Sequence, residues 1–169
     1  MLKCDSHNRV NDVDIFPISL KLQQQPCLIV GGGHIAYRKA VLLQKAGAVI
    51  SVISPEILPE LLEIVEQSQG QYVQSNFHDE INIRAYRLVI AATDDKATNQ
   101  NVFHVCELEN VLVNSVDDPP HCRFMVPAII DRSPLVVSIA TNGQSPVLSR
   151  QIRTQLEAAI PHGMGKLAE

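Results

Sequence analysis

The sequence of 169 residues lacks several features that mark particular functional classes. It contains no tryptophan and only 4% aromatic residues, which excludes an aromatic platform for stacking single-stranded nucleic acid. The 14 Lys and Arg residues are outnumbered by 18 Asp and Glu, so the cationic surplus that binds a phosphate backbone is missing. We therefore expect no nucleic-acid partner.

The sequence also has little that would indicate disulfides, metal sites or membrane segments. The four cysteines include no Cys-x-x-Cys pair, which predicts reduced thiols rather than a disulfide framework. His121 and Cys122 are adjacent, but two side chains alone do not make a metal site, so we predict none. No run of about 18 apolar residues could span a bilayer, and residues 1–12 lack the apolar core of a signal peptide. These features favour a cytoplasmic protein with no membrane partner.

Apolar residues make up 46% of the chain, and their pattern alternates between strands and helices. Four short apolar runs are typical of strands buried on both faces of a parallel sheet, at residues 27–30, 49–53, 87–92 and 111–116. Three helical patterns lie between them, at residues 35–46, 57–67 and 95–108. We also expect peripheral strands at 16–22 and 71–75. The alternation predicts an α/β fold with a Rossmann-like, doubly wound parallel sheet.

The pattern changes at residues 117–120, Asp-Asp-Pro-Pro, which can form neither a helix nor a central strand. Two strands at 124–130 and 135–140 and a helix over 145–160 are predicted to follow. The chain therefore divides into a Rossmann-like domain and a small strand-strand-helix segment, residues 1–118 and 119–169.

The turn after the first buried strand carries the sharpest motif. Residues 31–36, Gly-Gly-Gly-His-Ile-Ala, fit the dinucleotide fingerprint G-x-G-x-x-A between a predicted strand and a predicted helix. The glycines let a pyrophosphate approach the backbone, and the helix N-terminus offers free N–H groups to the anion. We predict that Gly31 and Gly33 bind a nucleotide, with a merely structural turn as the alternative.

The end of the second strand should bind the ribose of that nucleotide. Ser54, Pro55 and Glu56 stand there, where an acidic side chain commonly accepts hydrogen bonds from the ribose hydroxyls. Glu56 is the candidate, although it equally fits a solvated acid at the start of a helix. No Arg is present there for the extra phosphate of NADP, which favours NAD as the cofactor.

Two more strand ends point toward the same crevice. Thr93 and Asp94 follow the run at 87–92, and Asp94 or Asp95 is also expected to cap the next helix. Asp117 follows the run at 111–116, where a carboxylate could serve as a general base. Since Asp near Pro is common in turns, a structural turn is the alternative for Asp117.

A set of short stretches resembles one known family when it is taken together. They occupy residues 16–18, 27–33, 36–40, 54–56, 91–95 with Asn99, 114–119, 127–130 and 143–146. The family is precorrin-2 dehydrogenase / sirohydrochlorin ferrochelatase, which also forms the N-terminal half of siroheme synthase. The resemblance covers nearly the whole chain and is specific because the stretches occur jointly.

The resemblance implies a function in siroheme biosynthesis. Members transfer a hydride from precorrin-2 to NAD, giving sirohydrochlorin and NADH, and many then insert ferrous iron. It implies that Asp117 is the catalytic aspartate and that the region after residue 118 forms a homodimer. It also implies that the cofactor contacts the glycine loop through His34 and Ile35, and further Pro55, Glu56, Thr93 and Asp94. Precorrin-2 carries several carboxylates, so we expect Arg123 and Arg150, with Thr141 and Asn142, to bind it.

Two expectations stay open. The family usually continues with more helices beyond the position of Glu169, so we expect a truncated helical region at the C-terminus and uncertain ferrochelatase activity. A non-catalytic NAD(H)-sensing Rossmann module is the alternative to an enzyme, because a fold does not dictate a function.

Overall fold

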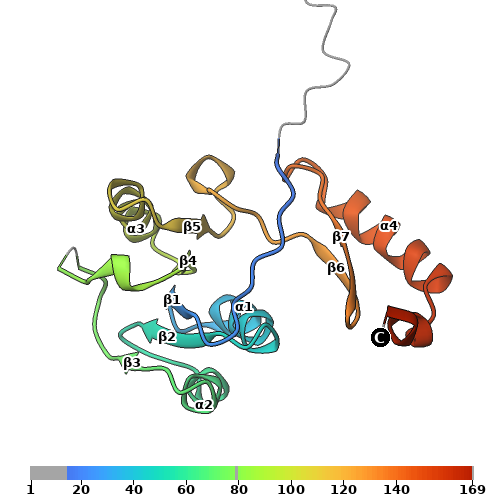
Figure 1. Ribbon diagram of the computed structural model, residues 1–169. Helices are drawn as coiled ribbons and strands as arrows, with labels where there is room; N and C mark the ends of the chain where they lie inside the picture. The colour runs from blue at the N-terminus through green and yellow to red at the C-terminus, as the bar shows by residue number, and fades with distance from the viewer. Residues whose placement is uncertain (1–14, 79, 169) are drawn as a thin grey trace, which may run out of the picture. The chain divides into compact units, whose positions relative to one another are not determined.

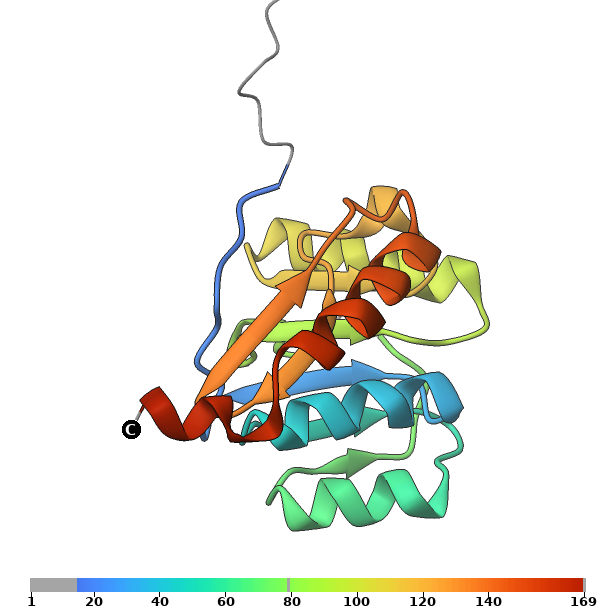
Figure 2. The same ribbon diagram turned by 90° about the vertical axis from the view of Figure 1, so that its right-hand side faces the viewer.

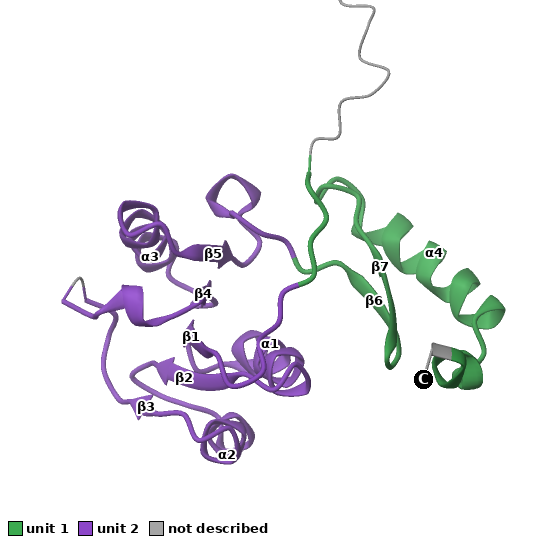
Figure 3. Ribbon diagram, viewed as in Figure 1, with its two compact units in different colours: residues 1–19, 126–169 green, residues 20–125 purple. Residues whose placement is uncertain are grey.

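The computed structural model describes residues 15–78 and 80–168, and the polar residues 1–13 lie outside this part of the chain. The chain forms two compact units, coloured separately in Figure 3. The sheet unit is Leu20–Met125, and the hairpin unit is Val126–Glu169 with Met1–Ser19. The boundary predicted from the sequence lies after residue 118. The division follows Met125 because residues 119–125 return to the sheet, where the Arg123 N–H donates to Val113 O.

The sheet unit is built on five parallel strands in the order β3-β2-β1-β4-β5 (Figure 1). The strands are β1 (Pro26–Val30), β2 (Val49–Ile53), β3 (Tyr72–Val73), β4 (Leu88–Ala91) and β5 (Leu112–Ser115). This confirms the predicted Rossmann-like sheet. The strand predicted at 71–75 is reduced to two residues, since it pairs only with the end of β2.

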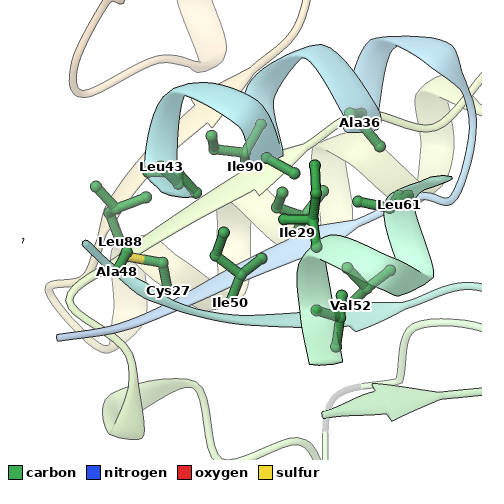
Figure 4. Packing of buried hydrophobic residues seen from close by; sticks show 14 residues of the cluster. Cys27, Ile29, Ala36, Leu43, Ala48, Ile50, Val52, Leu61, Leu88 and Ile90 are labelled. Carbon is green, nitrogen blue, oxygen red and sulfur yellow. The ribbon is translucent and has the colours of Figure 1, made fainter. Parts of the chain in front are cut away.

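Helices cover both faces of this sheet. They are α1 (His34–Lys45), α2 (Pro59–Gln67) and α3 (Lys96–Leu108). Cys27 and Ile29 of β1 pack into one cluster with α1 and α2 (Figure 4), whereas Leu28 and Val30 pack into another with α3. The alternation along β1 thus explains why the run is apolar throughout.

Local signals fix the helix ends. Gly47, with a φ of +74°, follows Ala46, the C-cap residue of α1, and Asp95 caps α3 by accepting from Ala97 N and Thr98 N. Two short 3-10 turns, Ile83–Ala85 and Pro119–His121, join strands to their neighbours.

The strand predicted at 16–22 is wrong. Residues 16–22 are an exposed loop, and Phe16 keeps 87% of its surface accessible. An alternating pattern forms a strand only beside a free sheet edge, and no described strand pairs with this segment.

The hairpin unit contains the predicted strand-strand-helix arrangement (Figure 2). β6 (Ala128–Arg132) and β7 (Leu135–Ile139) are antiparallel, and α4 (Pro146–Ala159) and a 3-10 helix (His162–Ala168) follow. Ser145 Oγ accepts from Leu148 N and caps α4, as predicted. None of the helices in residues 15–78 and 80–168 has the length and apolar character needed to cross a bilayer.

Candidate functional site

A cleft of about 710 Å³ lies at the carboxyl edge of the sheet unit. It is lined by the turns that follow β1, β2, β3 and β4. All nine residues predicted to bind the nucleotide line it: Gly31, Gly33, His34, Ile35, Ser54, Pro55, Glu56, Thr93 and Asp94. Segments more than 60 residues apart in sequence are thus brought into one site by the strand order.

The three glycines of the loop have different roles. Gly31 has a φ of +119°, and a Cβ there would lie 2.4 Å from Ala92 O. A Cβ on Gly32 would lie 1.9 Å from Glu56 O, so the neighbouring backbone excludes any side chain. A Cβ on Gly33 would meet no atom within 4 Å. Packing therefore requires glycine at positions 31 and 32, whereas position 33 is open.

The N-terminus of α1 fits an anionic ligand. Gly33 is the N-cap residue, and no side chain accepts a hydrogen bond from the first turn. The first N–H groups of a helix have no partner within the helix, so they are free to bind an anion. An open glycine and an uncapped helix thus face the cleft together, which suits the pyrophosphate of a dinucleotide.

Hydrogen bonds hold the turn after β2 in place. The Tyr72 hydroxyl donates to Ser54 O at 3.0 Å, and Gln74 Nε2 donates to Pro55 O at 3.1 Å. The exposed Glu56 follows at the cleft. Among the described residues that line the cleft, none is Lys or Arg. This lining offers a carboxylate for ribose hydroxyls and no cation for a further phosphate.

Sequence reasoning missed part of the cleft wall. Ser75, Asn76 and Phe77 follow β3 and line the cleft, as does Thr98 in the first turn of α3. The weak strand pattern at 71–75 could have indicated the residues that follow β3, because the carboxyl ends of parallel strands meet at one edge of the sheet.

Asp95, rather than Asp94, is the helix cap. Its carboxylate accepts from Ala97 N at 3.2 Å and from Thr98 N at 3.0 Å. The Thr98 hydroxyl donates to it at 2.6 Å, and these hydrogen bonds lower the pKa of Asp95. Asp94 and Asp95 both line the cleft, but only Asp95 also caps the helix.

Asp117 lies at the same sheet edge, next to the end of β4, but outside the cleft lining. The Val116 N–H donates to Ala91 O, which ties the end of β5 to that of β4. Asp117 is exposed and has a φ of +58°, which Asp tolerates better than most residues. Cys122 Sγ donates to Ser115 O at 3.1 Å and closes the turn around Asp117.

Lys39 is a charged neighbour of Asp117 that sequence reasoning missed. It is half-buried on α1, where burial lowers its pKa. The negative charge of nearby Asp117 opposes that decrease. Lys39 lies between Ala36 and Ala40, which are buried against the sheet, and Val116 packs against the same cluster. The small residues on either side of Lys39 therefore indicated that this part of α1 faces the sheet.

Other side chains around this turn pair with each other. His121 Nδ1 lies 2.8 Å from Asp118 Oδ2, whereas Cys122 Sγ donates to the backbone oxygens of Ser115 and Asp118. Arg123 Nε donates to Glu107 Oε1 at 2.6 Å, and this ion pair lowers the pKa of Glu107. No group of three or more His, Cys, Asp or Glu side chains in the described part of the chain could hold a metal ion.

Three predicted substrate residues belong to the hairpin unit. Thr141 Oγ1 donates to Ser145 O at 3.1 Å and lies 3.1 Å from Ser149 Oγ, which fixes the turn before α4. Asn142 follows with a φ of +51°, and Arg150 is exposed on α4. Their roles stay predictions.

Comparison with known proteins places this cleft in a family context. The model of a family described as putative NAD(P)-binding matches residues 18–128. The chain belongs to this NAD(P)-binding family. A second model, described as sirohaem biosynthesis protein central, matches residues 132–159. The two matches confirm the resemblance to siroheme biosynthesis proteins and assign the cleft to the NAD(P)-binding region.

Relatives of this family are considerably longer. Over 157 residues, 93% of the chain, it is 66% identical to siroheme synthase of Acinetobacter baylyi and 45% identical to that of Psychrobacter sp.. These alignments cover 34% and 32% of the relatives, so the chain spans about a third of their length. A solved structure, SirC, precorrin-2 dehydrogenase, is 26% identical with a TM-score of 0.77, over 90% of this chain and 74% of that one.

Proposed function

We propose that this chain oxidises precorrin-2 to sirohydrochlorin with NAD+ in siroheme biosynthesis. The observation that carries this proposal is the likeness to SirC, precorrin-2 dehydrogenase, which extends over 90% of the chain. Both units also have a family match, since residues 18–128 match the putative NAD(P)-binding model and residues 132–159 match the sirohaem biosynthesis protein central model.

The cleft supports NAD+ as the cofactor. The uncapped first turn of α1 binds the pyrophosphate, and Glu56 accepts hydrogen bonds from the ribose hydroxyls. The lack of Lys and Arg in the described lining favours NAD+ over NADP+. NAD+ bound there supplies the hydride acceptor for the reaction.

Asp117 serves as the base in this proposal. Dehydrogenation removes one hydride and one proton from precorrin-2, and the carboxylate of Asp117 takes the proton. Its exposure at the edge beside β4 makes it accessible to a large substrate. Lys39 provides a compensating positive charge close to this carboxylate.

The substrate carboxylates suggest roles for residues outside the cofactor cleft. Arg150, exposed on α4, can bind a carboxylate directly, and Thr141 and Asn142 hold the turn that precedes this helix. Arg123 is a second candidate, but it must exchange its ion pair with Glu107 for the substrate.

We also propose that the hairpin unit forms a homodimer. It exposes Val136, Val147, Leu148 and Leu167, which retain 46% to 83% of their surfaces. A two-stranded hairpin with one helix has no second layer large enough to bury these side chains, so we expect a second copy of the unit to bury them. Insertion of ferrous iron as a substrate and the cytoplasmic location stay predictions.

An anaerobic assay tests the dehydrogenase proposal. Purified protein receives precorrin-2 and NAD+, and the absorbances of NADH and sirohydrochlorin are followed together before ferrous iron is added. The proposal expects both to rise in step. NAD+ binding without oxidation would instead favour the sensing module.

Asp117→Asn tests the base within the same assay. Asn also tolerates a positive φ, so the turn should persist. We expect kcat to fall about 100- to 10,000-fold with the Kd for NAD+ unchanged. Turnover at the wild-type rate would refute the assignment.

A further inference from the structure

Asn99 is a buried amide on the face of α3 that is otherwise apolar. Together with Val102 and Cys106 it forms the buried stripe of this helix, and only 6% of its surface is exposed. Burial of an amide is unfavourable unless hydrogen bonds compensate, whereas a leucine would suit this stripe without them. An amide here therefore points to a specific partner.

That partner is Thr93, in the turn between β4 and α3. Asn99 Oδ1 accepts from Thr93 N at 3.2 Å and from Thr93 Oγ1 at 2.8 Å. Asn99 Nδ2 donates to Thr93 O at 2.9 Å. One side chain thus holds both backbone polar groups and the hydroxyl of a single residue.

These bonds decide what Thr93 can offer to a ligand. Its Oγ1 also lies 3.0 Å from Asp95 O and accepts from Asp95 N at 3.2 Å. The hydroxyl and the N–H of Thr93 are therefore both engaged within the protein. Although Thr93 lines the cleft, it shapes the wall rather than donating a hydrogen bond to the cofactor.

We propose that Asn99 is a positioning residue for the dinucleotide, because it fixes Thr93 in the turn against which the cofactor lies. Asn99 does not itself line the cleft, so it acts through Thr93. The identity of the ligand as NAD+ rests on the proposed function, but the role of Asn99 concerns binding and not turnover.

Calorimetry with NAD+ and thermal melting of the full chain test this role. We expect Asn99→Leu to raise the Kd for NAD+ about tenfold, the loss of one good contact. Ser68→Ala is the control, since Ser68 Oγ joins Ile50 N to Val65 O at the end of α2, away from the cleft. It should lower the melting temperature and leave the Kd unchanged. A folded Asn99→Leu protein with wild-type Kd would overturn the proposal.

Asn99→Asp decides the question where Asn99→Leu fails to fold. It keeps an acceptor for Thr93 N and loses the donor to Thr93 O, so weaker NAD+ binding is expected and wild-type binding contradicts the proposal. Thr93→Val added to the weaker-binding Asn99 variant should cause no further loss, because both act through one contact. Additive losses would show that Asn99 acts elsewhere.

Kinetics separate this role from the proposed reaction. If the chain oxidises precorrin-2, the Asn99 variants should raise the KM for NAD+ and retain the wild-type kcat. A large fall in kcat alone contradicts a positioning role. An inactive wild-type chain that still binds NAD+ refutes the proposed function, whereas the binding results continue to test Asn99.

Discussion

Replacement of Gly33 by alanine should weaken cofactor binding while the fold persists. The backbone at Gly33 is extended, with a φ of −88°, and a Cβ would meet no protein atom within 4 Å. Alanine at such a position stabilises a protein by about 0.4–1 kcal/mol through the unfolded chain. In a protein of this size we therefore expect an increase in melting temperature of about 1–4 °C.

The effect on binding has the opposite sign. The Cβ would occupy the open space beside the uncapped first turn of α1, where the pyrophosphate approaches. A lost hydrogen bond to a charged group is worth about 1.5–3 kcal/mol, which is an increase in Kd of about ten- to hundredfold. Gly33→Val should weaken binding further.

Two other glycines provide the contrast. Gly32→Ala should lower the melting temperature, because its Cβ would lie 1.9 Å from Glu56 O and the backbone must move. Gly163→Ala is the matched control: its Cβ also meets nothing within 4 Å, and it lies outside the sheet unit. Calorimetry with NAD+ and thermal melts measure all three. A Gly33→Ala protein with wild-type Kd would refute the placement of the pyrophosphate at this loop.

Three further predictions concern other parts of the molecule. Lys39→Met should lower kcat about tenfold in the wild type but not in Asp117→Asn, if its charge acts through Asp117; equal losses in both backgrounds would contradict this. Leu148→Glu, at a side chain 46% exposed on α4, should shift the chain toward monomer in sedimentation equilibrium, and an unchanged mass would exclude this face. Asp95→Ala should destabilise the fold at neutral pH, and its difference from wild type should shrink as the pH falls below 3.8. The sign follows because the folded-state pKa of Asp95 lies below that ordinary value, so its stabilisation is lost on protonation; a difference independent of pH would refute the carboxylate as the cap.

The sequence was sufficient for elements whose signals are local. The apolar run that ends at Val30 and the glycines that follow it predict β1, the turn and α1 together. The cap of α4 by Ser145 is equally local, because an N-cap bonds its own helix. Residues 16–22 show the limit, since their alternation is a property of the segment and pairing depends on a neighbouring strand.

The lining of the cleft was predictable where chemistry restricts the residue type. Gly31 and Glu56 stand at strand ends recognisable without knowledge of the strand order. Lys39 was not found, and Asn99 entered only as part of the family resemblance without a role, because the importance of both depends on which turns lie beside them in space. The sequence nevertheless contained a signal for Asn99, because it is a polar residue in the otherwise apolar stripe of α3.

Strand order explains both outcomes. Because β1 lies between β2 and β4, the glycine loop is adjacent to Glu56 on one side and to Thr93 on the other. β5 pairs with β4, and the Val116 N–H donates to Ala91 O, so Asp117, the proposed base, follows the strand next to the one that Thr93 follows. Residues that bind a ligand through backbone groups can be recognised from sequence motifs. Residues that position other residues can be recognised only once the fold is known. A search for the latter should begin with buried polar side chains on apolar helix faces near the carboxyl edge of the sheet.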